Sequence, residues 1–161
     1  MDKKVSSAEI THLLCREIQA PLVSALIKGF AKKIGDDKAL SIAKEIICED
    51  AALSGKSLAD KYSGNSLEDL LNIVKEVWAK DGTLEIKNIT LSESSLSFDV
   101  TSCGYAKMYE RSGIKELGSL LSCCRDFAFM DGFNPEIELI RTKTIMEGAD
   151  ICDFRYKRKD H

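Results

Sequence analysis

The sequence predicts an α+β fold in which N-terminal helices precede a β-β-α-α-β-β unit. Apolar residues recur with helical spacing up to residue 80, Asp81-Gly82 interrupts this pattern, and the spacing then changes to strand-like alternation. Two hairpins separated by helices favour an antiparallel sheet of about four strands with helices on one face. No repeat or linker divides the chain, so we expect residues 1–161 to form a single domain, with a helical half (1–80) and a half containing the sheet (83–158).

The helical half contains four predicted helices. In the first, apolar residues follow helical spacing after a cap at Ser6 or Ser7. Pro21 suits the first turn of the second helix, and residues 35–37 end that helix and begin the third. Ser66 begins a capping-box sequence before the fourth. The second helix carries Leu22, Leu26, Ile27 and Phe30, and the third is expected to turn Leu40, Ala43, Ile46 and Ile47 inward.

The second half starts with a predicted hairpin. Its strands contain Leu84 and Ile86, then Leu96 to Val100, with Ser92-Glu93-Ser94 as the turn. The alternation slips between Ile86 and Ile89, which indicates a bulge. The remaining predicted elements are a helix over 105–111, a second helix that starts near Leu117 and carries Cys123 and Asp126, and strands over 137–145 and 151–156. These two strands are joined at Gly148-Ala149-Asp150.

Composition and charge favour a soluble, globular protein. The content of 44% hydrophobic and 30% charged residues argues against disorder. A net charge of -3 argues against nucleic acid or an anionic membrane surface as a partner. The chain begins Met1-Asp2-Lys3-Lys4 without an apolar run, and no segment approaches the roughly 18 apolar residues of a membrane span, so we expect neither a signal peptide nor an anchor.

The cysteines indicate a reduced, cytoplasmic protein. Cys15 and Cys48 occupy apolar positions of predicted helices, where thiols behave as small hydrophobic groups. The neighbours Cys123 and Cys124 would diverge on a helix, so they are poor partners for each other. We therefore expect the six cysteines to form no disulfide framework.

The last third of the chain has the highest density of chemically reactive side chains. Cys123 and Asp126 are three residues apart on a predicted helix, so both can face one cavity. A nearby carboxylate raises the pKa of a thiol, so a cation would have to offset Asp126 if Cys123 were to react. Cys103 ends one strand and Cys152 begins another, so these thiols could reach the same place. The alternative is a cysteine packed in the core and a solvated Asp126.

Metal binding is a weaker interpretation of the same residues. Three cysteines and one carboxylate would suit zinc by composition. However, the chain has no Cys-x-x-Cys pair, and each thiol lies in a different element. We therefore expect no metal and no cofactor.

Arg141 is the candidate for binding a ligand carboxylate. It shares strand parity with Ile137 and Leu139, which favours a guanidinium that is buried or lines a pocket. The apolar Ile140 has the opposite parity, so the side of the sheet that Arg141 faces stays open. A structural salt bridge is an equally good interpretation, and Thr142 is either a ligand contact or an ordinary strand residue. His12 in the first helix is not part of a recognisable Cys-His dyad, and the scarcity of histidine argues against ordinary acyl-transfer chemistry.

The motifs of the second half resemble those of the L-2-amino-thiazoline-4-carboxylic acid hydrolase family. The matching residues are Thr101-Ser102-Cys103, Cys123 with Asp126, Asn134-Pro135, Arg141-Thr142 with Thr144, and Gly148 through Asp150-Ile151-Cys152-Asp153-Phe154. The hairpin-helix-hairpin order with its Gly-x-x-x-Cys-x-Phe ending is also similar to the small-molecule-binding domains named after vinyl reductase. Both resemblances imply an α+β fold that is often a homodimer.

The resemblance implies a hydrolase that opens a small cyclic amidine, such as 2-amino-thiazoline-4-carboxylate, to a carbamoyl-cysteine product. Cys123 and Asp126 would then be catalytic, and Arg141, Cys103, Thr142 and Cys152 would bind substrate. The alternative is a non-catalytic binding or sensor domain that uses the same pocket, which the scarcity of histidine favours. A third interpretation is a redox sensor that acts through its thiols or a metal.

Overall fold

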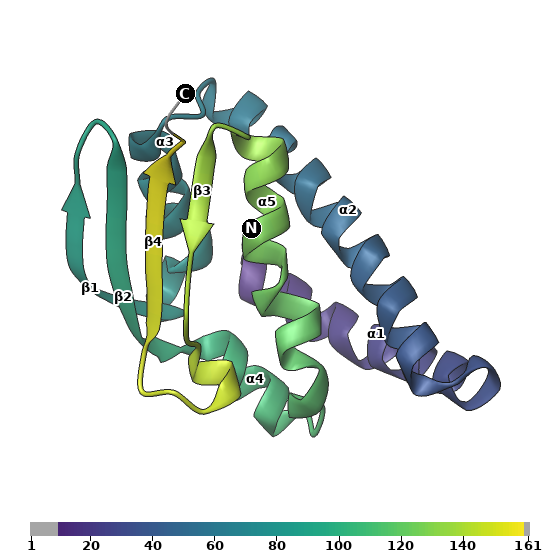
Figure 1. Cartoon of the computed structure of the whole chain (residues 1–161). Coiled ribbons are helices and arrows are strands. Elements are labelled where there is room, and N and C mark those ends of the chain that lie inside the picture. The colour runs from purple at the N-terminus through teal and green to yellow at the C-terminus, as the bar shows by residue number, and fades with distance from the viewer. Residues whose placement is uncertain (1–9, 160–161) are drawn as a thin grey trace, which may run out of the picture.

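The computed structural model describes residues 10–159 and confirms the predicted α+β class. Three helices precede the first hairpin, and two further helices separate it from the last two strands (Figure 1). The helices are α1 (His12–Ile34), α2 (Asp36–Tyr62), α3 (Leu67–Ile73), α4 (Gly104–Arg111) and α5 (Arg125–Phe133). The strands are β1 (Leu84–Leu91), β2 (Ser95–Cys103), β3 (Ile137–Ile140) and β4 (Cys152–Arg158).

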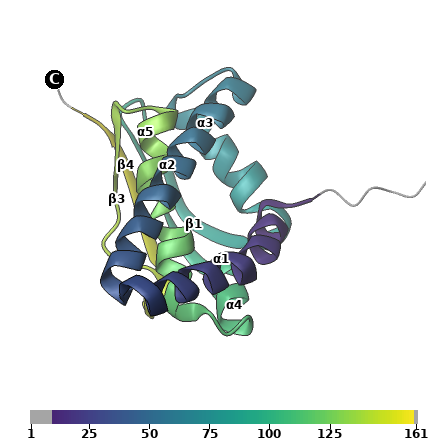
Figure 2. The same ribbon diagram turned by 90° about the vertical axis from the view of Figure 1, so that its right-hand side faces the viewer.

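The four strands form one antiparallel sheet in the order β1-β2-β4-β3, with helices on one face (Figures 1 and 2). The two central strands, β2 and β4, pair so that Phe98 lies opposite Phe154 and Val100 opposite Cys152. The Phe98 and Phe154 rings stack with their centroids 5.0 Å apart, and both side chains are buried. The alternating apolar residues of β2 and β4 therefore form the floor on which the helices pack.

The bulge predicted in the first strand is confirmed. The pairing of β1 with β2 shifts register between Lys87 and Thr90, and Asn88 has a left-handed backbone with φ of 55°. Asn88 Nδ2 donates a hydrogen bond of 2.8 Å to Asp99 Oδ2 across the hairpin. The predicted turn at 92–94 is also present, and Ser92 N donates to Ser95 O. An asparagine suits the bulge because its side chain tolerates a left-handed backbone.

The prediction of two helices on either side of Pro21 is wrong, because α1 continues through this proline. Proline removes one backbone donor, but the helix buries Ala20, Ser24 and Ile27 along one face before and after it. Burial of this face on both sides of the proline offsets the lost hydrogen bond, so the helix continues. The cap predicted at Ser6 or Ser7 lies outside the described residues; within them, Thr11 caps α1 and accepts a hydrogen bond from Leu14 N.

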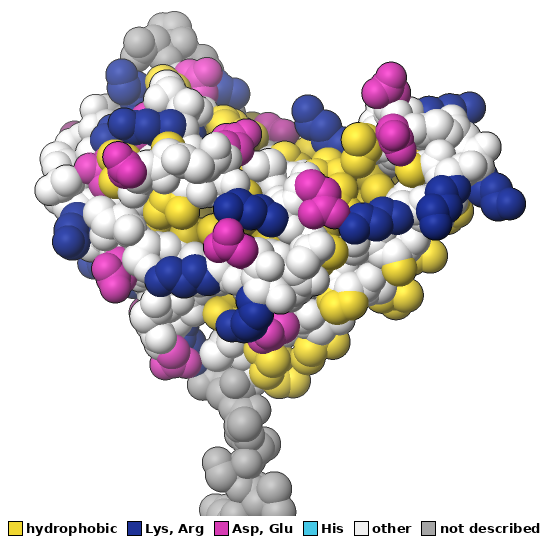
Figure 3. Space-filling model, turned by 90° about the horizontal axis from the view of Figure 1, so that it is seen from below, with side chains coloured by type: hydrophobic (Ala, Val, Ile, Leu, Met, Phe, Trp, Pro, Cys, Tyr) yellow, Lys and Arg dark blue, Asp and Glu magenta, His cyan; other side chains and the backbone are white. Residues whose placement is uncertain are grey.

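Several apolar residues of α1 and α2 that recur with helical spacing are exposed. Ile18, Leu22 and Phe30 of α1 are 58–67% exposed, and Ile46 of α2, which was expected to face inward, is 58% exposed. Hydrophobic side chains are visible along the part of the surface that these helices form (Figure 3). Helical spacing identifies residues on one side of a helix, but it does not tell which side the rest of the chain covers.

Helices α2 and α5 approach each other closely at two glycines. A Cβ atom on Gly132 of α5 would lie 1.8 Å from the carbonyl oxygen of Ala52, and one on Gly55 of α2 would lie 2.2 Å from that of Phe129. Backbone therefore meets backbone where the two helices pack. This contact fixes α5, the helix that carries Asp126, against the middle of α2.

The capping box predicted before the fourth helix is confirmed. Ser66 Oγ accepts from Asp69 N at 3.1 Å, and Asp69 Oδ2 accepts from Ser66 N at 2.9 Å. Helix α3 then continues into a π-helical segment, η1 (Val74–Trp78). None of the helices within residues 10–159 is both long enough and apolar enough to cross a lipid bilayer.

Candidate functional site

A cavity of about 500 Å³ lies between the helices and the sheet and brings the main candidate residues together. Its wall includes residues from α1, α2, η1, α5 and both central strands. The candidate site residues that line it are Cys103, Cys123, Asp126, Arg141 and Cys152. Residues from four separate segments of the chain therefore meet at one space, which has the size of a small-molecule site.

A π-helical turn presents Cys123 and Asp126 to this cavity. The segment η4 (Ser119–Cys123) is π-helical and leads directly into α5. Such turns hold one residue more than an α-helical turn and are frequent at functional sites. Ser122, Cys123, Asp126 and Phe129 all line the cavity, so the turn and the first part of α5 form one continuous wall.

Arg141 is already occupied by partners in the protein. Its Nη1 forms an ion pair with Asp126 Oδ2, and its Nη2 donates to Cys123 O at 2.9 Å. The guanidinium also lies 5.0 Å from the centroids of both the Phe127 and Phe154 rings. The side chain is only 5% exposed. This arrangement matches the salt-bridge interpretation of Arg141, because its donors hold α5 and Asp126 in place.

Asp126 keeps one oxygen available on the cavity side. Its side chain is 24% exposed, and Oδ1 has no hydrogen-bond partner among residues 10–159. Burial raises the pKa of Asp126, and the Arg141 guanidinium opposes this change. A carboxyl with a raised pKa and an unused oxygen can accept or donate a proton nearer to neutral pH than an ordinary aspartate can.

The three cavity thiols differ in their hydrogen bonds. Cys103 Sγ accepts from Ala106 N at 3.4 Å at the start of α4, and Cys152 Sγ accepts from Ile145 N at 3.2 Å. Cys123 Sγ has no hydrogen bond within the described part of the chain. Two of the thiols therefore support backbone turns, whereas the thiol of Cys123 is available to a ligand.

All three of these thiols are protonated at neutral pH. Burial raises the pKa of Cys123 to about 12, with a further contribution from Asp126, while Arg141 lowers it. Burial also raises the pKa of Cys152 to about 11 and raises that of Cys103. Reaction of Cys123 as a thiolate would thus require a bound cation to lower its pKa.

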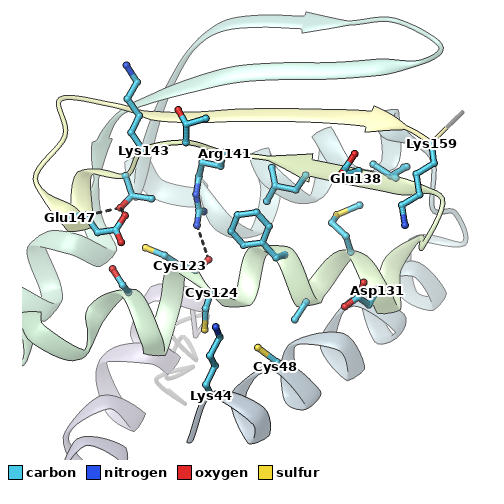
Figure 4. A pocket seen from close by; sticks show the side chains of 18 residues that line it. Lys44, Cys48, Cys123, Cys124, Asp131, Glu138, Arg141, Lys143, Glu147 and Lys159 are labelled. Atoms are coloured by element: carbon cyan, nitrogen blue, oxygen red, sulfur yellow. Dashed lines mark hydrogen bonds between the residues drawn. The ribbon is translucent and has the colours of Figure 1, made fainter. Parts of the chain in front are cut away.

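Thr142 lies away from the cavity. It lines an outer groove of about 740 Å³ between β3 and α5, together with charged residues such as Lys44, Glu138 and Lys159 (Figure 4). Its Oγ1 donates to Asp153 Oδ2 at 2.6 Å, because the chain leaves the sheet after Ile140 and turns over this carboxylate. The sheet strand predicted over 137–145 is therefore shorter, and the structure does not bring Thr142 together with the other candidates.

Cys123 and Arg141 line both the cavity and the outer groove. Figure 4 shows the Arg141 side chain reaching from the β3 side towards α5, beside Cys123. Cys124 also lines the groove but not the cavity. Its thiol donates to Leu120 O at 2.7 Å. Of these two adjacent cysteines only Cys123 lines the cavity, which makes Cys124 a matched control for it.

Two cavity residues on α1 were not among the residues chosen from the sequence. His12 Nδ1 lies 2.7 Å from Tyr105 Oη, and its Nε2 lies 3.5 Å from Arg16 Nη2. Since arginine only donates, Nε2 is the acceptor, Nδ1–H donates to Tyr105, and Tyr105 O–H donates to Trp78 O. The i, i+4 spacing of His12 and Arg16 was the available signal, but only the fold shows that both line the cavity.

His12 should make the protein less stable as the pH falls from about 6.5 to about 4. Burial, with Arg16 and Arg125, lowers the pKa of His12 from 6.5 to about 4. Between these values the unfolded chain binds a proton that the folded chain excludes, so folding loses up to about 3 kcal/mol. His12→Asn, whose amide can replace the Nδ1 donor, should show a flatter fall in the free energy of urea unfolding measured at pH 7, 5.5 and 4.5. Parallel curves for the two proteins would contradict this prediction.

The thiols and carboxylates of the cavity are not arranged for metal binding. Within residues 10–159, no three His, Cys, Asp or Glu side chains are grouped so that they could hold a metal ion. All six cysteines belong to this range, and each is a free thiol. The site is thus built of protonated thiols, the Asp126–Arg141 and Asp50–Arg125 ion pairs, and a neutral histidine.

The fold is similar to that of a solved trafficking protein, and the sequence matches one family. A trafficking protein particle complex subunit 3 from Naegleria fowleri, described as covalently bound to palmitic acid, aligns with a TM-score of 0.53 at 15% identity. The alignment covers 92% of this chain and 97% of that one, and at this identity it shows the fold alone. No curated protein matches the chain. The family described as L-2-amino-thiazoline-4-carboxylic acid hydrolase matches residues 15–156, and the chain therefore belongs to this family.

Proposed function

We propose that the protein is a hydrolase that opens a small cyclic amidine of the 2-amino-thiazoline-4-carboxylate type. Family membership supports hydrolysis. The observation that carries the proposal is the pair of neighbouring groups on the cavity wall: a Cys123 thiol without a partner among the described residues, and an Asp126 carboxyl with one unused oxygen. The cavity supplies an enclosed space in which both can contact one ligand.

The reaction adds water to the amidine carbon of the ring. The water oxygen bonds to this carbon, and the bond from the same carbon to the ring sulfur breaks. The sulfur takes up a proton, so the product is a carbamoyl-cysteine with a new thiol. Breaking the ring carbon-nitrogen bond instead would give a carbamoyl-cysteine without a thiol. A thiol reagent therefore distinguishes the two routes.

Asp126 suits the proton transfers of this reaction. Its unused oxygen can bind the amidinium or take a proton from the attacking water, and its raised pKa brings it closer to the working pH. Arg141 is a positioning residue, because it holds the other oxygen of Asp126. Since the Cys123 thiol is protonated, contact with the substrate suits it better than direct attack, unless the bound amidinium lowers its pKa.

The experiment is turnover of 2-amino-thiazoline-4-carboxylate by the purified protein, followed by release of thiol and by mass spectrometry of the product. We expect Asp126→Glu, which keeps the charge but moves the carboxyl, and Cys123→Ala to lower kcat by about 10-fold or more. The control Cys124→Ala, at the neighbouring position that faces the groove, should retain wild-type turnover. Lack of turnover by the folded wild-type protein would overturn the proposal, and full turnover by both site variants would remove these two residues from the mechanism.

The second candidate is a non-catalytic binding domain that uses the same cavity. It is favoured by the protonated state of all three cavity thiols, which leaves no nucleophile ready in the unliganded protein. A ligand retained through purification, detected by native mass spectrometry in a protein without turnover, would support this second function.

A further inference from the structure

Three arginines line the cavity, and only one of them is without a carboxylate partner among the described residues. Arg141 is paired with Asp126, and Arg125 Nη2 donates to Asp50 Oδ2 at 2.5 Å. Arg16 contacts only neutral groups: Gln19 Oε1 at 3.2 Å and His12 Nε2 at 3.5 Å. Within residues 10–159, Arg16 is therefore the cavity guanidinium that a ligand anion can use.

The surroundings of Arg16 hold it in place without neutralising it. His12 accepts from Arg16 and donates in turn to Tyr105, whose hydroxyl donates to Trp78 O. This chain of hydrogen bonds joins α1 to α4 and to η1. Burial and the charge of Arg125 lower the pKa of Arg16. The charge of Asp50, which makes no salt bridge with Arg16, opposes this only in part, so the charged state of Arg16 is costly in the unliganded cavity. A bound carboxylate would offset this cost.

The remaining wall near these groups is largely apolar. Leu58, Val77 and Trp78 line the cavity together with Phe98 and Phe129 of the core. A cavity of about 500 Å³ is also larger than an unsubstituted five-membered ring needs. The site thus combines one unpaired guanidinium with a sizeable apolar surface.

We infer that Arg16 binds the carboxylate of the ligand and that the ligand is an amphipathic carboxylic acid with an apolar part bulkier than a bare thiazoline ring. The guanidinium fork matches a carboxylate with two parallel hydrogen bonds. Arg16 takes the role that the sequence predicts for Arg141, whose charge is already paired with Asp126 and whose Nη2 already donates to Cys123 O. A ligand that is also an amidinium would extend from Arg16 to the unused oxygen of Asp126. The inference rests on the proposed function only in that both place their ligand in the same cavity.

The test measures binding by calorimetry at pH 7.5 with three probes: 2-amino-thiazoline-4-carboxylate, octanoate and octanamide. The last two differ in charge but share one apolar chain. We expect Arg16→Gln to weaken octanoate binding by about 10- to 100-fold and to leave octanamide binding within about twofold. Arg16→Lys should fall in between, because it keeps the charge but loses the fork. The control Arg111→Gln removes an exposed arginine that pairs with Glu17 outside the cavity and should change neither.

The outcomes separate this inference from the proposed function. Equal binding of octanoate by folded Arg16→Gln and wild-type protein overturns the inference, even if the thiazoline is hydrolysed. Binding of octanoate that depends on Arg16, without any thiazoline turnover, supports the inference and overturns the proposed hydrolase function. If only the thiazoline binds, and its binding depends on Arg16, then Arg16 does bind a ligand carboxylate, but the claim that the ligand has a bulkier apolar part is overturned. No binding of either carboxylate by the folded wild-type protein overturns the inference as a whole.

Discussion

A Gly132→Ala variant is expected to lose at least about 3 kcal/mol of folding free energy, or to fail to fold. The added methyl would lie 1.8 Å from Ala52 O, and this neighbour is helix backbone, which cannot rotate away as a side chain can. Gly55→Ala should behave in the same way, because its methyl would meet Phe129 O at 2.2 Å and Phe133 N at 2.8 Å. Helices α2 and α5 would have to separate to admit either methyl.

The control for both variants is Gly29→Ala in α1. A Cβ atom at Gly29 meets nothing within 4 Å, and the residue is exposed in the middle of the helix. There the helix propensity of alanine should stabilise the protein by about 0.5–1 kcal/mol. Urea unfolding of the three variants measures the contrast. A loss below about 1 kcal/mol for Gly132→Ala would mean that the two helices are not in contact as described.

Asp126→Asn is expected to destabilise the protein by about 3–5 kcal/mol. The substitution keeps the shape of the side chain but leaves the Arg141 guanidinium, which is 5% exposed, without its counter-charge. Replacing both residues, as in Asp126→Asn with Arg141→Met, should cost less than the single change. The reason is that the unpaired buried charge is then gone.

An exposed ion pair provides the comparison for Asp126. Glu110 and Lys115 lie 2.9 Å apart, but their side chains are 64% and 52% exposed. Glu110→Gln should therefore cost no more than about 0.5 kcal/mol. If Asp126→Asn is as mild as Glu110→Gln in chemical denaturation, the ion pair at the cavity wall does not exist as described. These stabilities also decide whether an inactive Asp126 variant has lost chemistry or folding.

The parts of the fold that were predicted correctly depend on local chemistry. The capping box at Ser66, the hairpin turn at Ser92 and the bulge after Lys87 each involve residues close in sequence, and their side chains or backbone preferences are sufficient to specify them. The order of helices and strands follows from the change in apolar spacing after Gly82. The errors in α1 have another origin: whether a helix crosses Pro21, and which of its faces is covered, depends on packing against distant elements.

In the candidate site, too, features set by residues close in sequence could be predicted, whereas features set by distant packing could not. Cys123 and Asp126 could be paired from the sequence because one helical segment carries both. Strand ends pointed to Cys103 and Cys152, strand parity pointed to Arg141, and the motif resemblance supported all three. The spacing of His12 and Arg16 puts both on one side of α1, but their place at the cavity could not be predicted, because it depends on how the first helix packs. The sequence also could not show whether Arg141 pairs with Asp126 or binds a ligand. Strand parity predicts which side of the sheet a side chain faces, but it does not predict its partner. The dimer that the family resemblance implies stays a prediction.

The wide turn before α5 makes the length of this segment a criterion for comparing members of the family. Ser119–Cys123 contains one residue more than an α-helical turn of the same span. A chain with one residue deleted there would form an ordinary turn and rotate all later side chains of the helix by about 100°. Asp126 would then point away from Arg141, even though every residue of the motif was kept. Counting the residues between Gly118 and Asp126 in a relative should therefore separate proteins that keep this acid-thiol geometry from those that share only the name.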